Sequence, residues 1–119
     1  MSSVSTCLQE LMKIEGSLGA VVIDLKTSRV LGLLGDSPTL DVDAAMMTDM
    51  LKARLRILQS FDRTEQIDDV VFTQTRQYHL LRCVGGAHGS LVYLTLNRQR
   101  ANLALARVKL ARLDSELVV

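Results

Sequence analysis

Three runs of apolar and β-branched residues follow one another in the second half of the chain, at 67–73, 76–84 and 90–96. Each run is rich in Val, Leu, Tyr, Phe or Thr, which strands favour, and short polar or glycine-rich segments separate them. The first break, 73–75, is short enough for a tight turn. The second, 85–89, contains glycines that adopt positive φ at little steric cost. The pattern predicts an antiparallel meander of three strands.

Both faces of this meander carry apolar side chains, and neither face is consistently polar. Leu80 and Leu81 are neighbours in the middle run, so they point to opposite faces of the sheet. An antiparallel sheet with one face in water shows a clean alternation of apolar and polar residues, which is absent here. We therefore expect both faces to be covered, by helices of this chain or by a partner. Asp68 and Asp69 make the first run the most polar, and such charges favour an edge position.

The first part of the chain predicts a helix followed by a strand hairpin. Thr6 and Gln9 form a candidate capping box for a helix over about 6–15, whose apolar residues recur at helical spacing. Two apolar runs at 19–24 and 29–34 then predict two strands joined by a short polar loop.

A second helix, expected over about 42–60 with Thr39 or Asp41 as its cap, is more apolar than one sheet requires. At about 100° per residue, its apolar positions cover about half of the circumference or more. These positions are Met46, Met47, Met50, Leu51, Ala53, Leu55, Ile57 and Leu58. Arg54 lies inside this arc, whereas Asp49, Lys52, Arg56 and Gln59 lie opposite. The excess apolar surface predicts a second contact for this helix.

The three methionines of this helix allow two interpretations. Unbranched thioethers suit an adaptable contact surface, and they are equally suited to filling an irregular core. A third helix, expected over about 100–117 with a single apolar stripe, leaves a similar choice. Its basic residues from Arg98 to Arg112 would suit a phosphate or an acidic partner, or simply form a solvated face.

Composition and charge narrow the class of protein. The chain of 119 residues fits one domain, 1–119, and with 48% hydrophobic but only 3% aromatic residues its core must be aliphatic. A net charge of +1 gives no indication of nucleic acid or membrane partners. The start of the chain lacks the pattern of a signal peptide and no segment is long enough to span a bilayer, so we expect a cytoplasmic protein. Cys7 and Cys83 are expected to be reduced and unpaired.

No residue pattern predicts catalysis, a metal site or a cofactor. His79 and Cys83 share a strand face, but about 13 Å of extended chain separates them, which is too far for a nucleophile and its base. The glycines at 85–89 are not followed by the Lys-Ser/Thr of a phosphate-binding loop. We expect no enzyme activity; a weaker interpretation places a small-ligand or catalytic site near Tyr78 and Tyr93.

Two stretches give the chain a resemblance to a known family. LQELMKIEGSLGAVVIDLKTSRVLG, at 8–32, is similar to the opening helix, glycine-bounded entry and first strand of the roadblock/dynein light chain domain family. YHLLRCVGGAHGSLVYLTLNRQRANLALARVKLARL, at 78–113, is similar to the family's last strands and final helix. The resemblance extends over essentially the whole chain. It implies an α/β (α+β) three-layer sandwich: a five-stranded antiparallel sheet in the order α-β-β-α-β-β-β-α, with helices on both faces.

The resemblance also implies function. Members of the family pair their second helices and third strands into a homodimer, and prokaryotic members commonly regulate Ras-like small GTPases. Carried onto this chain, the dimer interface would comprise Met46, Met47, Met50, Leu51, Arg54, Leu58, Val70 and Phe72. Exposed charges beside it, which the fold would not need, would contact the partner: Asp49, Lys52, Arg56, Asp68 and Asp69. We therefore expect a bacterial homodimer that binds a small GTPase, with a structural scaffold subunit as the alternative.

Overall fold

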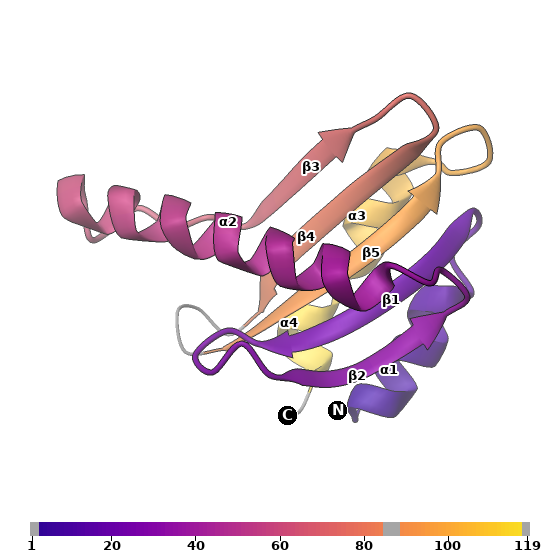
Figure 1. The fold of residues 1–119 in the computed structure, drawn as a ribbon, viewed down its shortest axis with the longest axis horizontal. Helices are drawn as coiled ribbons and strands as arrows, with labels where there is room; N and C mark the ends of the chain where they lie inside the picture. The colour runs from indigo at the N-terminus through magenta and orange to yellow at the C-terminus, as the bar shows by residue number, and fades with distance from the viewer. Residues whose placement is uncertain (1–2, 85–88, 118–119) are drawn as a thin grey trace.

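The computed structural model describes residues 3–84 and 89–117, and in this part of the chain five strands form one antiparallel sheet (Figure 1). Along the chain the elements are α1 (Val4–Met12), β1 (Ser17–Asp24), β2 (Val30–Gly35), α2 (Leu40–Phe61), β3 (Asp69–Thr73), β4 (Gln77–Val84), β5 (Ser90–Asn97), α3 (Leu103–Ala111) and α4 (Leu113–Glu116). The predicted meander and hairpin are both present. The glycine-rich break predicted at 85–89 lies, except for Gly89, outside the described residues.

Strand order in the sheet is β2-β1-β5-β4-β3, with every neighbouring pair antiparallel. The last strand therefore lies in the middle, where it joins the β1–β2 hairpin to the meander. Residues 91–96 of β5 are all buried, as expected for a strand with two neighbours and two covered faces. The prediction that the strand beginning at Asp69 lies at an edge is confirmed.

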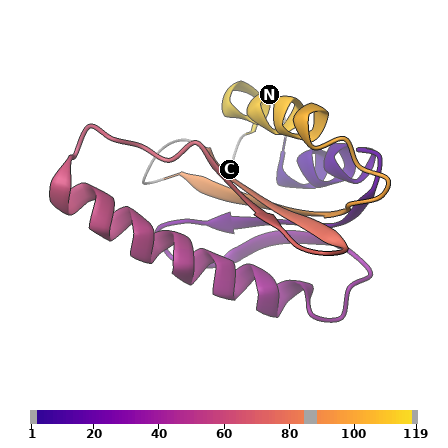
Figure 2. The same cartoon turned by 90° about the horizontal axis from the view of Figure 1, so that it is seen from above.

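Helices cover both faces of the sheet, which confirms the three-layer prediction (Figure 2). On one face α1, α3 and α4 pack over an aliphatic core that includes Leu8, Val22, Leu94 and Leu110. On the other face α2 alone packs over a second core. No described helix has both the length and the apolar composition needed to cross a membrane.

The start of α1 differs from the prediction. Ser3 is its N-cap, and its Oγ accepts a hydrogen bond of 3.2 Å from the backbone N–H of Thr6. The predicted capping box of Thr6 and Gln9 is therefore wrong, because an equally good cap stands three residues earlier. At the other end the helix stops at Met12 rather than Glu15, before Gly16, whose φ is +88°.

The predicted third helix is shorter and divided. It begins only at Leu103, since the Asn102 side chain caps it by accepting from the N–H of Leu105 at 3.0 Å. It breaks at Arg112, between α3 and α4. Ala106, Leu110 and Leu113 form the predicted buried stripe, but Leu105 and Val108 are exposed, so the outer side of α3 is not wholly polar.

Candidate interaction site on helix α2 and strand β3

The inner face of α2 is a single stripe of buried residues. Leu40, Ala44, Thr48 and Leu51 recur every three or four residues and are each at most 1% exposed. The one polar member, Thr48, donates its hydroxyl to the carbonyl of Ala44 at 2.7 Å, so no buried hydroxyl is left unpaired. This stripe fixes α2 on the sheet and leaves the rest of the helix facing outwards.

A second apolar stripe runs along the outside of α2. Its members, which we call the outer stripe, are Val42 (55% exposed), Met46 (66%), Met50 (38%), Ile57 (50%) and Phe61 (86%). They follow one another at four- and seven-residue steps, so they line one side of the helix. The C-terminal end of α2 extends beyond the sheet, where none of the described strands lies beneath it (Figures 1 and 2).

Contacts on the flanks of α2 fix the direction in which the outer stripe points. On one flank Lys52 donates to the hydroxyl of Ser28, in the β1–β2 hairpin, at 2.5 Å. On the opposite flank the negative charge of Asp43 acts to raise the pKa of both His79 in β4 and Tyr93 in β5. Asp43 and the outer stripe lie on the same side of the helix. The outer stripe is therefore turned away from the hairpin and towards the side of the sheet that ends in β3.

Strand β3 presents the free edge on that side, because it pairs only with β4. Val70 and Phe72 are half-buried and pack against the core beneath α2. Their remaining exposed surface and the unpaired backbone edge of β3 lie on the side to which the outer stripe points. Together the outer stripe and the β3 edge form the candidate interaction site.

The predicted interface residues divide between the two faces of α2. Met46 and Met50 belong to the outer stripe, and Arg54 is exposed. Met47 and Leu51 pack inwards on the sheet, and Leu51 is 1% exposed, so assigning them to a dimer interface does not agree with their packing. Met47 thus fits the interpretation as core packing, whereas Met46 and Met50 fit the interpretation as a contact surface.

Sequence reasoning missed three members of the outer stripe as site residues. Ile57 was recognised as apolar but was not assigned to the interface. Val42 and Phe61 lie at the first residue of the predicted helix and one residue beyond its end. Their four-residue steps from Met46 and Ile57 are the signal that identifies them.

The two acids at the start of β3 have different surroundings. Asp69 accepts two hydrogen bonds from Arg107 of α3, at 2.9 and 3.0 Å, and lies 3.9 Å from Arg82 of β4. Only 12% of its side chain is exposed. The expectation that the fold does not need this charge is therefore wrong, because Asp69 ties β3 to α3. Asp68 is exposed.

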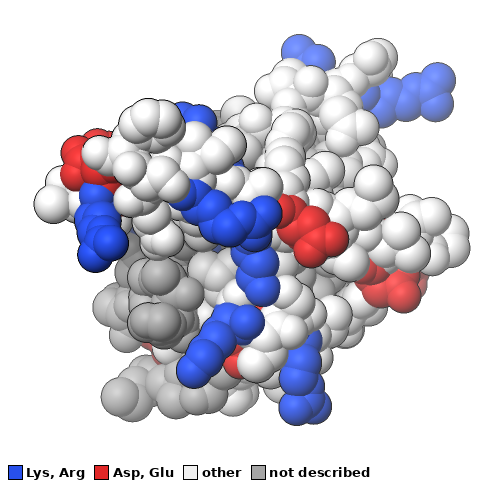
Figure 3. All heavy atoms as spheres, turned by 60° about the vertical axis from the view of Figure 1, so that its left-hand side comes forward, with Lys and Arg blue, Asp and Glu red and all other residues white. Residues whose placement is uncertain are grey.

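The predicted partner-binding residues of α2 lie on the surface, though one of them is engaged. Asp49 and Arg56 are exposed, whereas Lys52 is half-buried and bonded to Ser28. In Figure 3, which brings forward the side of the molecule with the C-terminal part of α2, Lys and Arg side chains lie interspersed with Asp and Glu on a largely uncharged surface. The site thus combines apolar residues with charged margins, as protein interfaces do.

A buried polar pair lies beneath α2. The Nδ1 of His79 is hydrogen-bonded to the hydroxyl of Tyr93 at 2.5 Å, and its Nε2 to Oε1 of Gln77 at 2.8 Å. Burial lowers the pKa of His79 and raises the pKa of Tyr93, in both cases because the charged form loses water; Asp43 opposes the first shift and adds to the second. His79 is 5% exposed and Tyr93 fully buried, so this pair is enclosed in the core.

The two cysteines lie in different cores. Cys7 is buried among the residues beneath α1, while Cys83 packs in the core beneath α2, on the opposite face of the sheet. Burial, with a smaller effect of Glu116, raises the pKa of Cys7 to about 11, which keeps it a thiol at neutral pH. Among the described residues, no group of His, Cys, Asp and Glu is arranged to hold a metal ion.

Comparisons with known proteins identify the architecture. No protein-family model matches the sequence, and no curated protein is similar to it. The structure is similar to the crystal structure of a Roadblock/LC7 domain from Streptomyces avermitilis, with a TM-score of 0.77 and 16% identity over 95% of this chain and 92% of that one. It is also similar to the gliding protein MglB from Thermus thermophilus, with a TM-score of 0.71 and 20% identity over 91% and 80% of the two chains. A structure of MglB in a tetrameric arrangement gives 0.74 and 19%, over 91% and 79%. The chain therefore has the roadblock/LC7 fold, as its sequence resemblance predicted.

Proposed function

We propose that this chain is a protein-interaction domain that forms a homodimer through the outer stripe of α2 and the edge of β3, and that the dimer binds and regulates a Ras-like small GTPase. In this proposal it acts in the bacterial cytoplasm and has no catalytic activity of its own. The observation that carries the proposal is the outer stripe: five large apolar side chains in one row, exposed on a helix whose inner face is already packed.

The energetic argument concerns apolar surface. Burying a large apolar side chain that would otherwise be exposed contributes about 1.5–3 kcal/mol. A row that includes Phe61, 86% exposed, and Met46, 66% exposed, therefore offers several kcal/mol to a partner that covers it. This gain has to exceed the entropy lost on association, which a contiguous and rigid helical surface helps it to do.

The charges along α2 favour a second copy of the same helix as that partner. The N-terminal half carries Asp41, Asp43 and Asp49, and the C-terminal half Lys52, Arg54 and Arg56. Two such helices packed antiparallel about a two-fold axis place acidic halves opposite basic halves. The spacing of the outer stripe suits this arrangement, because Val42 then lies opposite Phe61 and Met46 opposite Ile57, with Met50 near the centre. Asp49 of one helix comes close to Arg56 of the other.

The similar proteins support self-association, and the family resemblance supports the GTPase. One of the similar solved structures is of MglB in a tetrameric arrangement, and another is of a gliding protein. Regulation of a small GTPase is what the resemblance to prokaryotic roadblock proteins implies. A regulator of this kind shifts the nucleotide state only if it binds one state more tightly than the other.

Light scattering of the purified chain tests the dimer. We expect a mass of two chains at micromolar concentration and a shift towards monomer in Met50→Lys, which places an unpaired charge in the interface. Gln9→Lys is the matched control, since Gln9 is exposed on the outward side of α1. A monodisperse monomer of the unmutated chain would contradict the assignment of the outer stripe.

Titration calorimetry tests the regulatory role. The purified chain is titrated with a Ras-like small GTPase from the same organism, loaded with GDP or with a GTP analogue. We expect clearly different affinities for the two states. Equal affinity for both would favour the alternative, a scaffold subunit without effect on nucleotide turnover.

A further inference from the structure

Arginines gather at one end of the sheet, around the turn that follows β3. Two connections meet there: the β3–β4 turn, which contains Arg76, and the segment after β5, which contains Arg98 and Arg100. The backbone N–H of Arg98 donates to the carbonyl of Arg76 at 3.0 Å. This bond brings the two connections together and places the backbones of three arginines on neighbouring segments.

Arg98 is held in place by the fold. Its Nη1 donates to the carbonyl of Gln74 at 3.1 Å, and its Cζ lies 5.6 Å from the centre of the Tyr78 ring. Asn97 orders the segment that follows, since its carbonyl accepts from the N–H of Arg100 and its side chain from that of Gln99. The positions of the three arginine backbones are therefore fixed before any partner binds, which reduces the entropic cost of binding.

Arg76 and Arg100 have no internal role comparable to that of Arg98. Both side chains are exposed, and within the described residues neither forms an ion pair. Exposed Glu15 adjoins this end of the sheet, because it precedes Gly16, whose carbonyl accepts from the N–H of Asn97. The two connections, 74–76 and 98–102, contain three arginines and no acidic residue, so this end of the sheet carries a local excess of positive charge.

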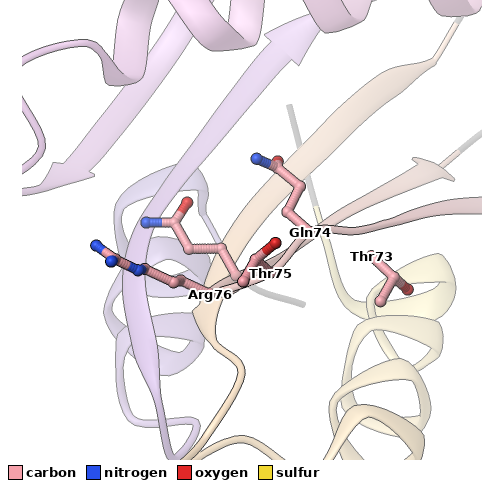
Figure 4. Close-up of a pocket in the computed structure, with 5 residues that line it drawn as sticks. Thr73, Gln74, Thr75 and Arg76 are labelled. Carbon is pink, nitrogen blue, oxygen red and sulfur yellow. The ribbon is translucent and has the colours of Figure 1, made fainter.

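The surface along the β3–β4 turn, at Arg76, is hollowed and carries polar side chains. An open depression along the β3–β4 turn is lined by Thr73, Gln74, Thr75, Arg76 and Gln77, and Figure 4 labels the first four of these residues. Hydroxyl and amide groups there can hydrogen-bond an extended backbone, and guanidinium groups pair with carboxylates through two parallel hydrogen bonds. We name the three arginines and this depression the arginine patch.

We propose that the arginine patch binds an acidic, extended segment of a partner protein. Nucleic acid fits less well, because the chain has a net charge of only +1 and the aromatic ring at the patch, Tyr78, is already covered by Arg98. The open and shallow form of the depression suits a chain with spaced carboxylates better than a single enclosed anion. The patch belongs to one protomer, so the proposal holds whether or not the chain forms a dimer.

Fluorescence anisotropy with a labelled peptide of alternating glutamate and glycine tests the proposal. We expect saturable binding to the full chain that weakens steeply as salt rises from about 0.1 M to about 1 M, where the Debye length falls from about 10 Å to about 3 Å. Arg76→Glu combined with Arg100→Glu should weaken binding at least about tenfold, because it replaces two attractive charges by two repulsive ones. Arg98 is left unchanged, since it contributes to the fold.

The matched control is Lys26→Glu combined with Arg29→Glu. Both residues are exposed in the β1–β2 connection at the other end of the sheet, and the change in net charge is the same. We expect the control to bind the peptide within about twofold of the unmutated chain, because these charges are remote from the patch. No binding at low salt, or an equal loss in both double variants, would overturn the proposal. So would tighter binding of a single-stranded oligonucleotide with the same number of charges.

Discussion

Helices α1 and α2 rest on opposite faces of the same sheet, yet their outward sides differ in chemistry. The outward side of α1 carries Ser5, Thr6, Gln9 and Glu10, and Glu10 forms an exposed ion pair with Lys13 at 2.9 Å. The outward side of α2 carries the outer stripe. A helix that contacts only its own sheet has no need of a second apolar stripe. The comparison shows that the outward side of α1 is polar, whereas α2 has an apolar surface that the described residues of the chain leave exposed.

Removing side chains from the two faces of α2 should give the largest contrast. Leu51→Ala deletes a residue that is 1% exposed in the core and should lower the free energy of unfolding by about 2–5 kcal/mol. Met46→Ala, at a position 66% exposed, should change the free energy of unfolding of the monomer by no more than about 0.5 kcal/mol. Denaturant unfolding of both variants, at a concentration below the dimer's dissociation constant, measures the difference. Similar losses would show that the outer stripe is part of the monomer's own core.

Acid should weaken the face under α2 through His79. Burial lowers its pKa in the folded chain, so the unfolded chain binds the proton more readily. Stability should therefore fall as the pH drops below about 6.5, the ordinary value for His, by at most about 1.4 kcal/mol per pH unit, until the pH reaches the lowered pKa. Thermal unfolding between neutral and mildly acid pH, compared with His79→Gln, measures this effect. An identical pH dependence in the variant would exclude His79 as the cause.

A charge exchange on the flank of α2 should give the smallest effect, and it tests the orientation of the proposed dimer. Asp49→Arg should weaken dimerisation by about 0.5–1 kcal/mol, because it faces Arg56 of the partner in the antiparallel arrangement. Adding Arg56→Asp should restore the affinity, while each exposed change alters the monomer's stability by no more than about 0.5 kcal/mol. Analytical ultracentrifugation of the single and double variants measures the coupling. Simple additivity of the two changes would argue against antiparallel pairing.

The sheet also has two unlike edges. Strand β3 begins at Asp69, directly after Asp68, and Asp69 accepts a hydrogen bond from Arg107 of α3. Strand β2 has no charged residue and exposes Val30, Leu31, Leu33 and Leu34 by 36–48%. Charges at an edge discourage unspecific pairing, so the β3 edge is the better protected of the two.

The pattern along the chain determined the elements and their faces. Apolar, β-branched runs bounded by short breaks predicted the five strands, and apolar residues at helical spacing predicted the first two helices. The lack of polar alternation in the meander predicted a sheet covered on both faces. Asp68 and Asp69 predicted an edge strand for a different reason, because charges at an edge discourage unwanted pairing. The predicted start of a helix was wrong where several capping residues stand close together, as with Ser3 and Thr6 at the start of α1.

Tertiary structure decided which apolar residues of α2 point inwards. An apolar arc of about half the circumference is wider than the stripe that one sheet covers. The sequence therefore could not show which part of it faces the sheet, and could not separate Leu51 and Met47 from Met46 and Met50. The sheet chose the inner stripe, and the remainder became the outer stripe. Pairs such as Asp69 with Arg107 and His79 with Tyr93, 38 and 14 residues apart, likewise exist only because the fold brings their strands and helices together. Local periodicity cannot predict such contacts, because the two residues of each pair lie on different elements and meet only when those elements pack together.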